Sequence, residues 1–124
     1  MVKGLDDRFL LRLARDRLRV VDPSDIYYLE AVGRTTLVRL RSAKRLRDLR
    51  PCGELANLLS SHGFLRIHRN YIVNLRRVLQ VRQRGAGADW ELCLEPPVGT
   101  VLPVSRQAIR WVRQAFGDRL HRDE

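Results

Sequence analysis

The sequence predicts a mainly β fold with one short internal helix and a C-terminal helix. Short runs of β-branched, aromatic and aliphatic residues recur along the chain and are separated by Gly, Pro, Asp and Ser, a pattern typical of roughly eight short strands. Only two segments show the apolar spacing of an amphipathic helix. The 124 residues, 44% of them hydrophobic, suffice for the core of one domain, so we expect a single domain over residues 1–124.

The first half of the chain is expected to form mainly strands. Residues 9–14 and 18–21 flank a polar turn and predict a β-hairpin. Turn residues at 22–25 precede a strand over 26–31, and a tight break at Gly33 precedes a strand over 35–41. Residues 42–49 fit either of two structures. Leu46 and Leu49 have helical spacing, whereas a hairpin after residue 43 favours a strand.

Both helices are placed by their start and stop signals. Pro51 suits the first turn of a helix that runs through Leu59 and is stopped by Gly63. Ser105 is an N-cap for a closing helix through Phe116, with Gly117 after its end. We expect Ile109, Val112 and Phe116 to form the apolar face of that helix, and strands over residues 78–82, 90–94 and 98–104 to lie between the two helices.

The charge balance indicates a polyanionic partner. Lys and Arg number 24 against 14 Asp and Glu, which gives a net charge of +10, and only Lys3 and Lys44 are lysines. Such a domain attracts nucleic acid first and anionic membrane second. The arginine bias has two interpretations, since guanidinium groups suit phosphate and guanine but a GC-rich genome also enriches arginine.

Several function classes are excluded by what the sequence lacks. Cys52 and Cys93 have no companion at metal-finger spacing, which indicates reduced thiols and no metal. The sequence shows no Gly-rich phosphate loop, paired carboxylates or nucleophile–base signature, so we expect neither a cofactor nor an enzyme. It also has no signal peptide and no apolar span, so we expect a cytoplasmic protein without membrane insertion.

Three motifs in order resemble the LytTR DNA-binding domain of bacterial response regulators. They are residues 26–35 (IYYLEAVGRT), 64–75 (FLRIHRNYIVNL) and 102–106 (LPVSR), and the resemblance extends over about residues 18–116. It implies an elongated stack of small antiparallel sheets that binds double-stranded DNA. Two protomers would occupy adjacent direct-repeat half-sites, with loops in successive major grooves. Family members usually carry a phosphorylatable receiver domain of two-component signalling. This chain has no room for one, which implies either a stand-alone regulator, controlled by a partner protein or by its own abundance, or a fragment of a longer protein.

The resemblance assigns DNA contacts to three places: Gly33, Arg34 and Thr35 at the end of the first motif, Arg69 in the second, and Arg106 in the third. Two departures from the family pattern matter. Asn70 stands where serine is usual, and the Arg34-Thr35 loop lacks the usual asparagine or histidine, so base preference there does not carry over.

The other polar residues near these motifs have simpler interpretations. Asn70 is either a base contact or a turn cap, and Arg76 and Arg77 are either DNA backbone contacts or solvated charges. His68 has no catalytic partner in the sequence and is expected to be structural, while Asn74 is expected to fix a local turn. A basic cluster is expected to form a solvated face, with phosphate contact as the alternative: Lys44, Arg45, Arg47 and Arg50.

The favoured function is therefore sequence-specific regulation of transcription on duplex DNA. An RNA-binding β module is the first alternative, but it needs an aromatic stacking platform, and the aromatic residues are only 6% of the chain and scattered. A protein-interaction domain whose charge keeps it soluble is the second alternative.

Overall fold

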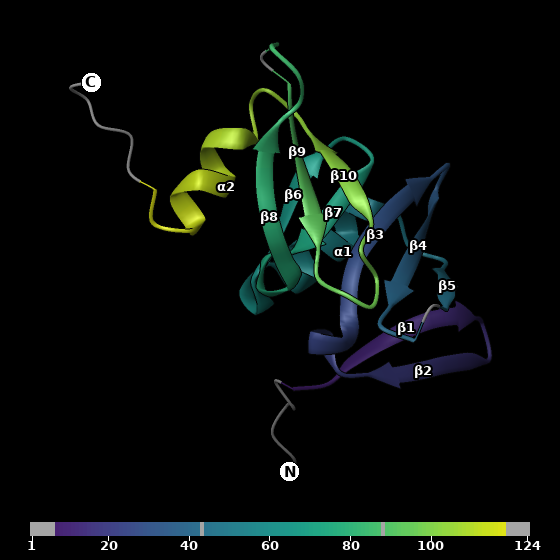
Figure 1. Cartoon of the computed structure of the whole chain (residues 1–124). Helices are drawn as coiled ribbons and strands as arrows, with labels where there is room; N and C mark the ends of the chain where they lie inside the picture. The colour runs from purple at the N-terminus through teal and green to yellow at the C-terminus, as the bar shows by residue number, and fades with distance from the viewer. Residues whose placement is uncertain (1–6, 43, 88, 119–124) are drawn as a thin grey trace.

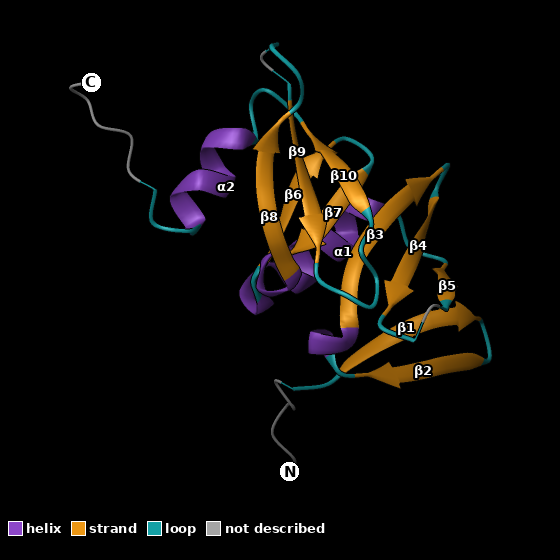
Figure 2. Ribbon diagram, in the orientation of Figure 1, coloured by secondary structure: helices purple, strands orange, loops and turns teal. Residues whose placement is uncertain are grey.

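The computed structural model describes residues 7–42, 44–87 and 89–118, and within them it confirms a mainly β architecture. The termini included in the single-domain prediction, residues 1–6 and 119–124, lie outside the described residues. Ten strands form three antiparallel sheets in the described part of the chain, accompanied by two α-helices (Figures 1 and 2). The elements are β1 (Phe9–Ala14), β2 (Arg17–Val21), β3 (Ile26–Val32), β4 (Thr35–Leu40), β5 (Arg45–Asp48), α1 (Cys52–Leu59), β6 (Phe64–His68), β7 (Tyr71–Asn74), β8 (Val78–Gln83), β9 (Trp90–Leu94), β10 (Val101–Val104) and α2 (Ile109–Ala115).

A five-stranded sheet with the order β5-β4-β3-β7-β6 forms the centre of the molecule. The ambiguous segment after residue 42 joins this sheet as β5, because Leu46 pairs with Val38 and Asp48 with Thr36. Leu49 is 42% exposed and takes no part in a helical stripe. Pairing with β4, which is a tertiary interaction, therefore decides between the two structures that the local sequence allows.

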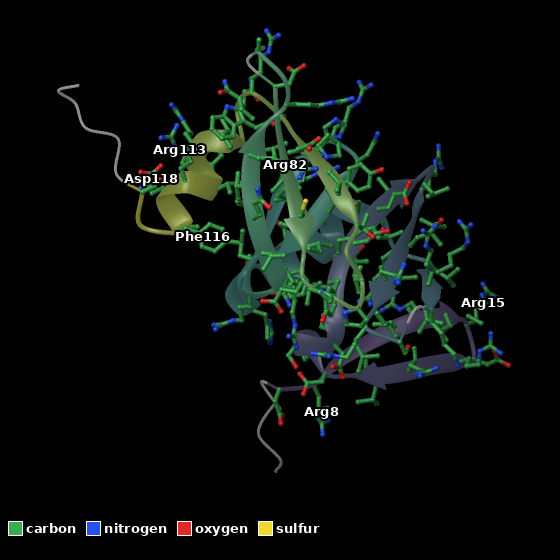
Figure 3. The ribbon with its side chains drawn as sticks, viewed as in Figure 1. Arg8, Arg15, Arg82, Arg113, Phe116 and Asp118 are labelled. Carbon is green, nitrogen blue, oxygen red and sulfur yellow. The ribbon has the colours of Figure 1, made fainter. Side chains whose placement is uncertain are left out.

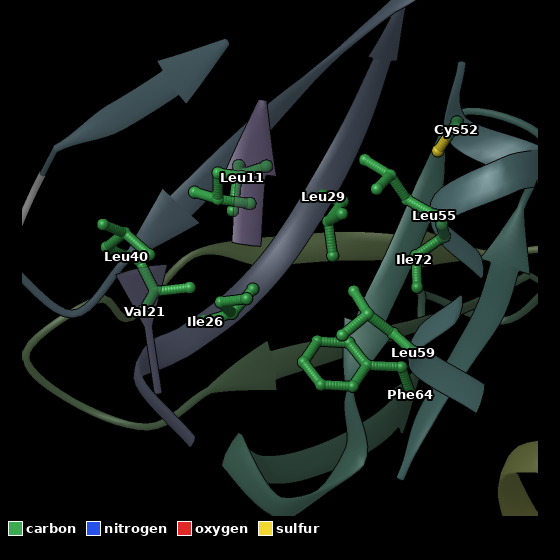
Figure 4. Close-up of a cluster of buried hydrophobic side chains, with 11 residues drawn as sticks. Leu11, Val21, Ile26, Leu29, Leu40, Cys52, Leu55, Leu59, Phe64 and Ile72 are labelled. Atoms are coloured by element: carbon green, nitrogen blue, oxygen red, sulfur yellow. The ribbon is translucent and has the colours of Figure 1, made fainter. Parts of the chain in front are cut away.

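Two hydrophobic cores lie on the two faces of the central sheet. The first is enclosed by α1 and the β1–β2 hairpin and includes Leu29 and Ile72 (Figure 4). The second is enclosed by the β8–β9–β10 sheet and α2, and includes Tyr28 and Val73. Neighbouring residues of β3 and of β7 thus point into different cores. This explains why these strands are continuous apolar runs rather than alternating ones.

The β1–β2 hairpin is fastened to the central sheet by a buried ion pair. The Asp48 carboxylate is fully buried and accepts hydrogen bonds from the Arg12 backbone N–H and from the backbone and guanidinium of Arg50, at 2.8–2.9 Å. Arg50 also donates to the Leu10 carbonyl at 2.8 Å. Placing Arg50 on a solvated face was therefore wrong, since its side chain is only 11% exposed.

The helix ends differ in detail from the sequence prediction. Pro51 is the N-cap of α1, and Gly63 adopts φ +83° after a 3₁₀ turn that follows the helix. The second helix begins at Ile109, because residues 106–108 form a separate turn that Ser105 caps through its Oγ, which accepts the Ala108 N–H at 3.1 Å. Phe116 is the C-cap of that helix and is 51% exposed, and it lines a groove together with Val112 and Val81.

Candidate nucleic-acid interface

Three connections that carry predicted DNA contacts lie at one end of the molecule. The Ala31 N–H, near the end of β3, donates to the Asn70 carbonyl in the β6–β7 turn at 2.8 Å. The Ser105 N–H, after β10, donates to the Ile67 carbonyl near the end of β6 at 2.8 Å. The β3–β4 turn, the β6–β7 turn and the β10–α2 connection therefore share the upper end of the molecule in Figure 1. We call Arg34, Arg69 and Arg106, one on each connection, the arginine edge.

The β3–β4 turn is a tight turn whose first residue needs a left-handed backbone. Gly33 supplies it with φ +60°, and Arg34 follows with an exposed side chain. The Thr35 hydroxyl donates to the Val32 carbonyl at 3.1 Å and accepts from Arg47 Nη1 at 2.6 Å. The hydroxyl proton of Thr35 is therefore already in a hydrogen bond within the protein. The main effect of Thr35 is to hold the Arg47 guanidinium beside the arginine edge.

The β6–β7 turn is fixed by hydrogen bonds on both sides. His68 Nδ1 accepts the Asn70 N–H at 3.1 Å, and the Arg66 guanidinium donates to the Arg69 carbonyl at 2.5 Å. The His68 ring also lies 5.7 Å from the Tyr71 ring, centroid to centroid. His68 therefore shapes the turn, as a structural histidine would. The side chains of Arg69 and Asn70 are exposed and have no hydrogen-bond partner within the described part of the chain.

The β10–α2 connection presents Arg106 beside a groove. Arg106 is exposed and lies between Ser105 and Gln107, which line a groove of about 510 Å³. The same groove is lined by residues of the β6–β7 hairpin and by α2, so it runs between two of the three connections. Its walls are Arg66, His68, Arg69, Ser105, Gln107, Ala108 and Trp111.

The arginines of the edge differ in their pairing from those arginines that lie against a carboxylate. Arg82 lies against Glu91 and Arg113 against Asp118, and Figure 3 shows the latter pair beside α2. No carboxylate of the described residues lies within ion-pair distance of Arg34, Arg69 or Arg106. Their charge is therefore not neutralised locally and is available to an anionic ligand.

Two of the predicted DNA-binding residues lie elsewhere. Arg76 and Arg77 follow β7 at the end opposite to Asn70, because β7 separates the two positions. Arg77 donates to the Ser24 carbonyl at 2.9 Å, lies 3.6 Å from Glu95 and stacks 5.1 Å from the centre of the Tyr27 ring. Neither residue belongs to the arginine edge, and Arg77 is committed to contacts within the protein.

Asn74, expected to fix a turn, is almost completely buried. Its amide donates to the Ile26 carbonyl at 2.9 Å, and its Oδ1 accepts the Arg76 N–H at 3.1 Å. It thus connects β7 with the start of β3 and caps the 3₁₀ turn that follows. This arrangement agrees with a structural role.

Sequence reasoning missed two residues that shape this end of the molecule. Arg47 was assigned to a solvated basic face, and Asp48 was not singled out. Both lie on β5, whose pairing with β4 could not be decided from the local sequence. Asp48 is an acidic residue inside a strongly basic segment, and this was the one signal that could have drawn attention to it.

Within residues 7–42, 44–87 and 89–118, the structure contains no group of three or more His, Cys, Asp or Glu side chains arranged to hold a metal ion. Neither of the helices in these ranges has the length and apolar character needed to cross a membrane.

Comparisons with known proteins give one consistent result. A family model described as the LytTr DNA-binding domain matches residues 16–117. The sensory transduction protein LytT of Oceanobacillus iheyensis is 28% identical over 101 residues, which is 82% of this chain and 41% of that protein. The CO-responsive transcriptional regulator RcoM of Rhodospirillum rubrum is 32% identical over 93 residues, 75% of this chain and 38% of that protein. The chain therefore spans about two fifths of the length of these relatives.

A solved structure has the same fold. The LytTr DNA-binding domain of a response regulator from Bacillus cereus superposes with a TM-score of 0.72 at 24% sequence identity, covering 90% of this chain and 98% of that one. At this identity the likeness establishes the arrangement of the strands and helices.

Proposed function

Because this chain belongs to the LytTR family of DNA-binding domains, we propose that it is a sequence-specific regulator of transcription whose arginine edge reads duplex DNA in the major groove. The family consists of DNA-binding transcription regulators rather than enzymes. The observation that carries the proposal is the placement of three exposed, unpaired arginines on three hydrogen-bonded connections at one end of the molecule. A guanidinium group at such a position can donate two hydrogen bonds to guanine O6 and N7.

The stiffness of the connections supports base reading. The β6–β7 turn is held through Ala31, His68 and Arg66, so its side chains start from a fixed backbone. Little conformational entropy is then lost when they bind. Asn70 adds an amide that can pair with adenine. The Thr35 hydroxyl already donates its hydrogen bond to the Val32 carbonyl, so Thr35 contributes mainly by positioning Arg47.

The proposal extends to the assembly on DNA. Two copies bind adjacent half-sites in the same orientation, about one helical turn or roughly 34 Å apart. A partner protein or a further domain controls them, and duplex DNA as the ligand implies action in the cytoplasm. Arg76 remains a proposed contact to the DNA backbone and would require the duplex to extend beyond the arginine edge.

The test is a comparison of Arg106→Ala with Arg8→Ala, each of which removes one positive charge. Arg8 lies at the opposite end of the molecule (Figure 3). Binding sites are selected from a random duplex library with each variant and sequenced. Arg106→Ala should lose preference at one base position, worth about 1–3 kcal/mol, while Arg8→Ala keeps the wild-type motif.

A uniform loss of affinity on all duplexes would reduce Arg106 to a phosphate contact. Stronger binding to single-stranded RNA than to the selected duplex would contradict the proposal and favour an RNA-binding module. Absence of binding to any nucleic acid at low salt would favour a protein-interaction domain.

A further inference from the structure

The outer edge of β2 is an unpaired strand edge. The β1–β2 hairpin is a sheet of only two strands, so β2 pairs with β1 on one side alone. Residues 17–20 are all exposed, and no other described strand lies against their free side. Backbone N–H and C=O groups along such an edge can pair with an extended segment of another chain.

A basic groove lies against this edge. It has a volume of about 530 Å³ and separates β2 from the end of β4. Arg19 and Arg41 face it, and no carboxylate of the described residues is within ion-pair distance of either. The lining holds three arginines against two aspartates, Asp22 and Asp25. Asp22 already accepts two hydrogen bonds from Ser24 and lies 3.6 Å from Arg8. The complete lining is Arg8, Arg19, Val20, Val21, Asp22, Asp25, Leu40, Arg41 and Ser42.

The other face of the hairpin exposes aliphatic side chains, together with Arg12 opposite Leu18. Leu18 and Val20 are 56% and 59% exposed, and Leu10, which pairs with Val20, is 47% exposed. Side chains alternate between the two faces of a strand. β2 therefore offers aliphatic groups on its outer face and arginines on the face that borders the groove.

We propose that the β2 edge binds an extended segment of a partner protein in which aliphatic and acidic residues alternate. The segment would add a strand beside β2. Its aliphatic side chains would then cover Leu18 and Val20, and its carboxylates would face Arg19 and Arg41. The hairpin is a firm platform for this, because Asp48 and Arg50 fasten it to the central sheet.

Other occupants fit less well. A second copy pairing through the same edge would bring Arg17 and Arg19 of one copy close to those of the other, and facing like charges destabilise a strand pair. The groove lies at the Leu40 end of β4, whereas Arg34 of the arginine edge precedes the opposite end of that strand at Thr35. The segment would therefore bind independently of the proposed DNA contacts.

The test uses a short fluorescent peptide of alternating valine and glutamate, long enough to cover the five residues of β2. Binding to the full chain is measured by fluorescence anisotropy. Two control peptides keep the composition. One groups the valines and glutamates in separate blocks, and the other has N-methylated backbone amides, which cannot pair with a strand edge. We expect the alternating peptide to bind about tenfold more tightly than either control.

Variants of the protein locate the site. Arg19→Glu should weaken binding of the alternating peptide by about tenfold or more, whereas Arg15→Glu, the same charge change at the tip of the hairpin (Figure 3), should have little effect. Amide shifts in NMR spectra should appear at residues 17–21. Equal binding of the three peptides, equal effects of the two variants, or shifts confined to the arginine edge would each overturn the proposal without affecting that for DNA.

Discussion

At the scale of single residues, Tyr27 carries a hydroxyl group that the fold buries without a hydrogen bond. Its side chain is fully buried, and the hydroxyl has no partner among the described residues. The ring nevertheless makes favourable cation–π contacts, because the guanidinium carbons of Arg41 and Arg77 lie 5.9 and 5.1 Å from its centroid. The hydroxyl thus costs desolvation energy, while the ring contributes packing and cation–π attraction.

Replacement of Tyr27 by phenylalanine should therefore stabilise the protein. The change keeps the ring and removes the stranded hydroxyl, which costs about 1–3 kcal/mol when it is left unpaired. Urea denaturation should show a higher free energy of unfolding for Tyr27→Phe. The Tyr28 hydroxyl is not stranded in this way, so Tyr28→Phe should bring no such gain. A destabilised Tyr27→Phe variant would show that the hydroxyl is hydrogen-bonded in solution.

At the scale of secondary-structure elements, β5 fastens the N-terminal hairpin through one carboxylate. Burial of Asp48 raises its pKa, but the hydrogen bonds from Arg50 and from the Arg12 backbone outweigh this and hold the pKa below the ordinary value of 3.8. The hydrogen bond with the Asp48 carboxylate raises the pKa of Arg50. A lowered carboxyl pKa means that ionised Asp48 stabilises the folded state.

Stability should accordingly depend on Asp48 in acid. Its contribution is fully present above the ordinary pKa of 3.8 and is lost as the pH falls through the lower value of the folded state. Asp48→Asn should cost about 3 kcal/mol at neutral pH, because Arg50 is left buried without its partner. In Asp48→Asn the free energy of unfolding, measured by chemical denaturation, should also decrease less as the pH falls into the acid range. The control Asp16→Asn, at an exposed position, should have the wild-type stability and the wild-type decrease of stability in acid.

The β6–β7 turn provides a second test at this scale. His68→Ala removes the acceptor of the Asn70 N–H, a hydrogen bond worth about 1 kcal/mol. DNA affinity in a gel-shift assay should then fall by about fivefold, since Arg69 and Asn70 would start from a looser backbone. His68→Asn offers a side-chain oxygen near the position of Nδ1 and should restore most of the affinity. Equal affinity of His68→Ala and the wild type would exclude the positioning role.

Elements whose causes are local could be predicted from the sequence. The β1–β2 hairpin, β3, the break at Gly33 and the helix α1 depend on nearby turn residues and apolar spacing, and the structure confirms them. The state of β5 depends on its pairing with β4, a distant partner, and the sequence left it open.

The same distinction applies to the candidate site. Arg34, Arg69 and Arg106 could be selected because each lies in a recognisable motif, and the fold brings their connections together. Arg47 could not, because its link to Thr35 runs between two strands whose register is a tertiary property. Arg76 and Arg77 were chosen as basic residues just past Asn74, and the fold places them at the other end of β7 from the β6–β7 turn.

At the scale of the whole molecule, the net charge of +10 and the arginine edge should make separable contributions to DNA binding. Charge spread over the surface attracts phosphates regardless of sequence, whereas contacts to bases select a site. Replacing all three arginines of the edge by alanine lowers the net charge but leaves most of the basic residues in place.

Binding of the triple variant should therefore lose its sequence preference and keep most of its salt dependence. The plot of the logarithm of the association constant against that of salt concentration should become shallower by about one unit for each residue that was a phosphate contact. Near-complete loss of this salt dependence would mean that the three arginines contact phosphates and not bases. Parallel titrations on a selected duplex and on a random duplex measure both quantities.

The packing of β3 and β7 on both sides has a consequence for how binding preferences change. The connections that carry Arg34 and Arg69 prolong strands that are clamped between two cores, so their backbone has little freedom to refit around an altered operator. When a base in the operator is changed, the arginine facing it would lose its hydrogen bonds to that base, and the backbone would not shift to form new ones. Divergence toward new operators would then proceed by exchanging side chains at these few positions, while the course of the chain stays as it is.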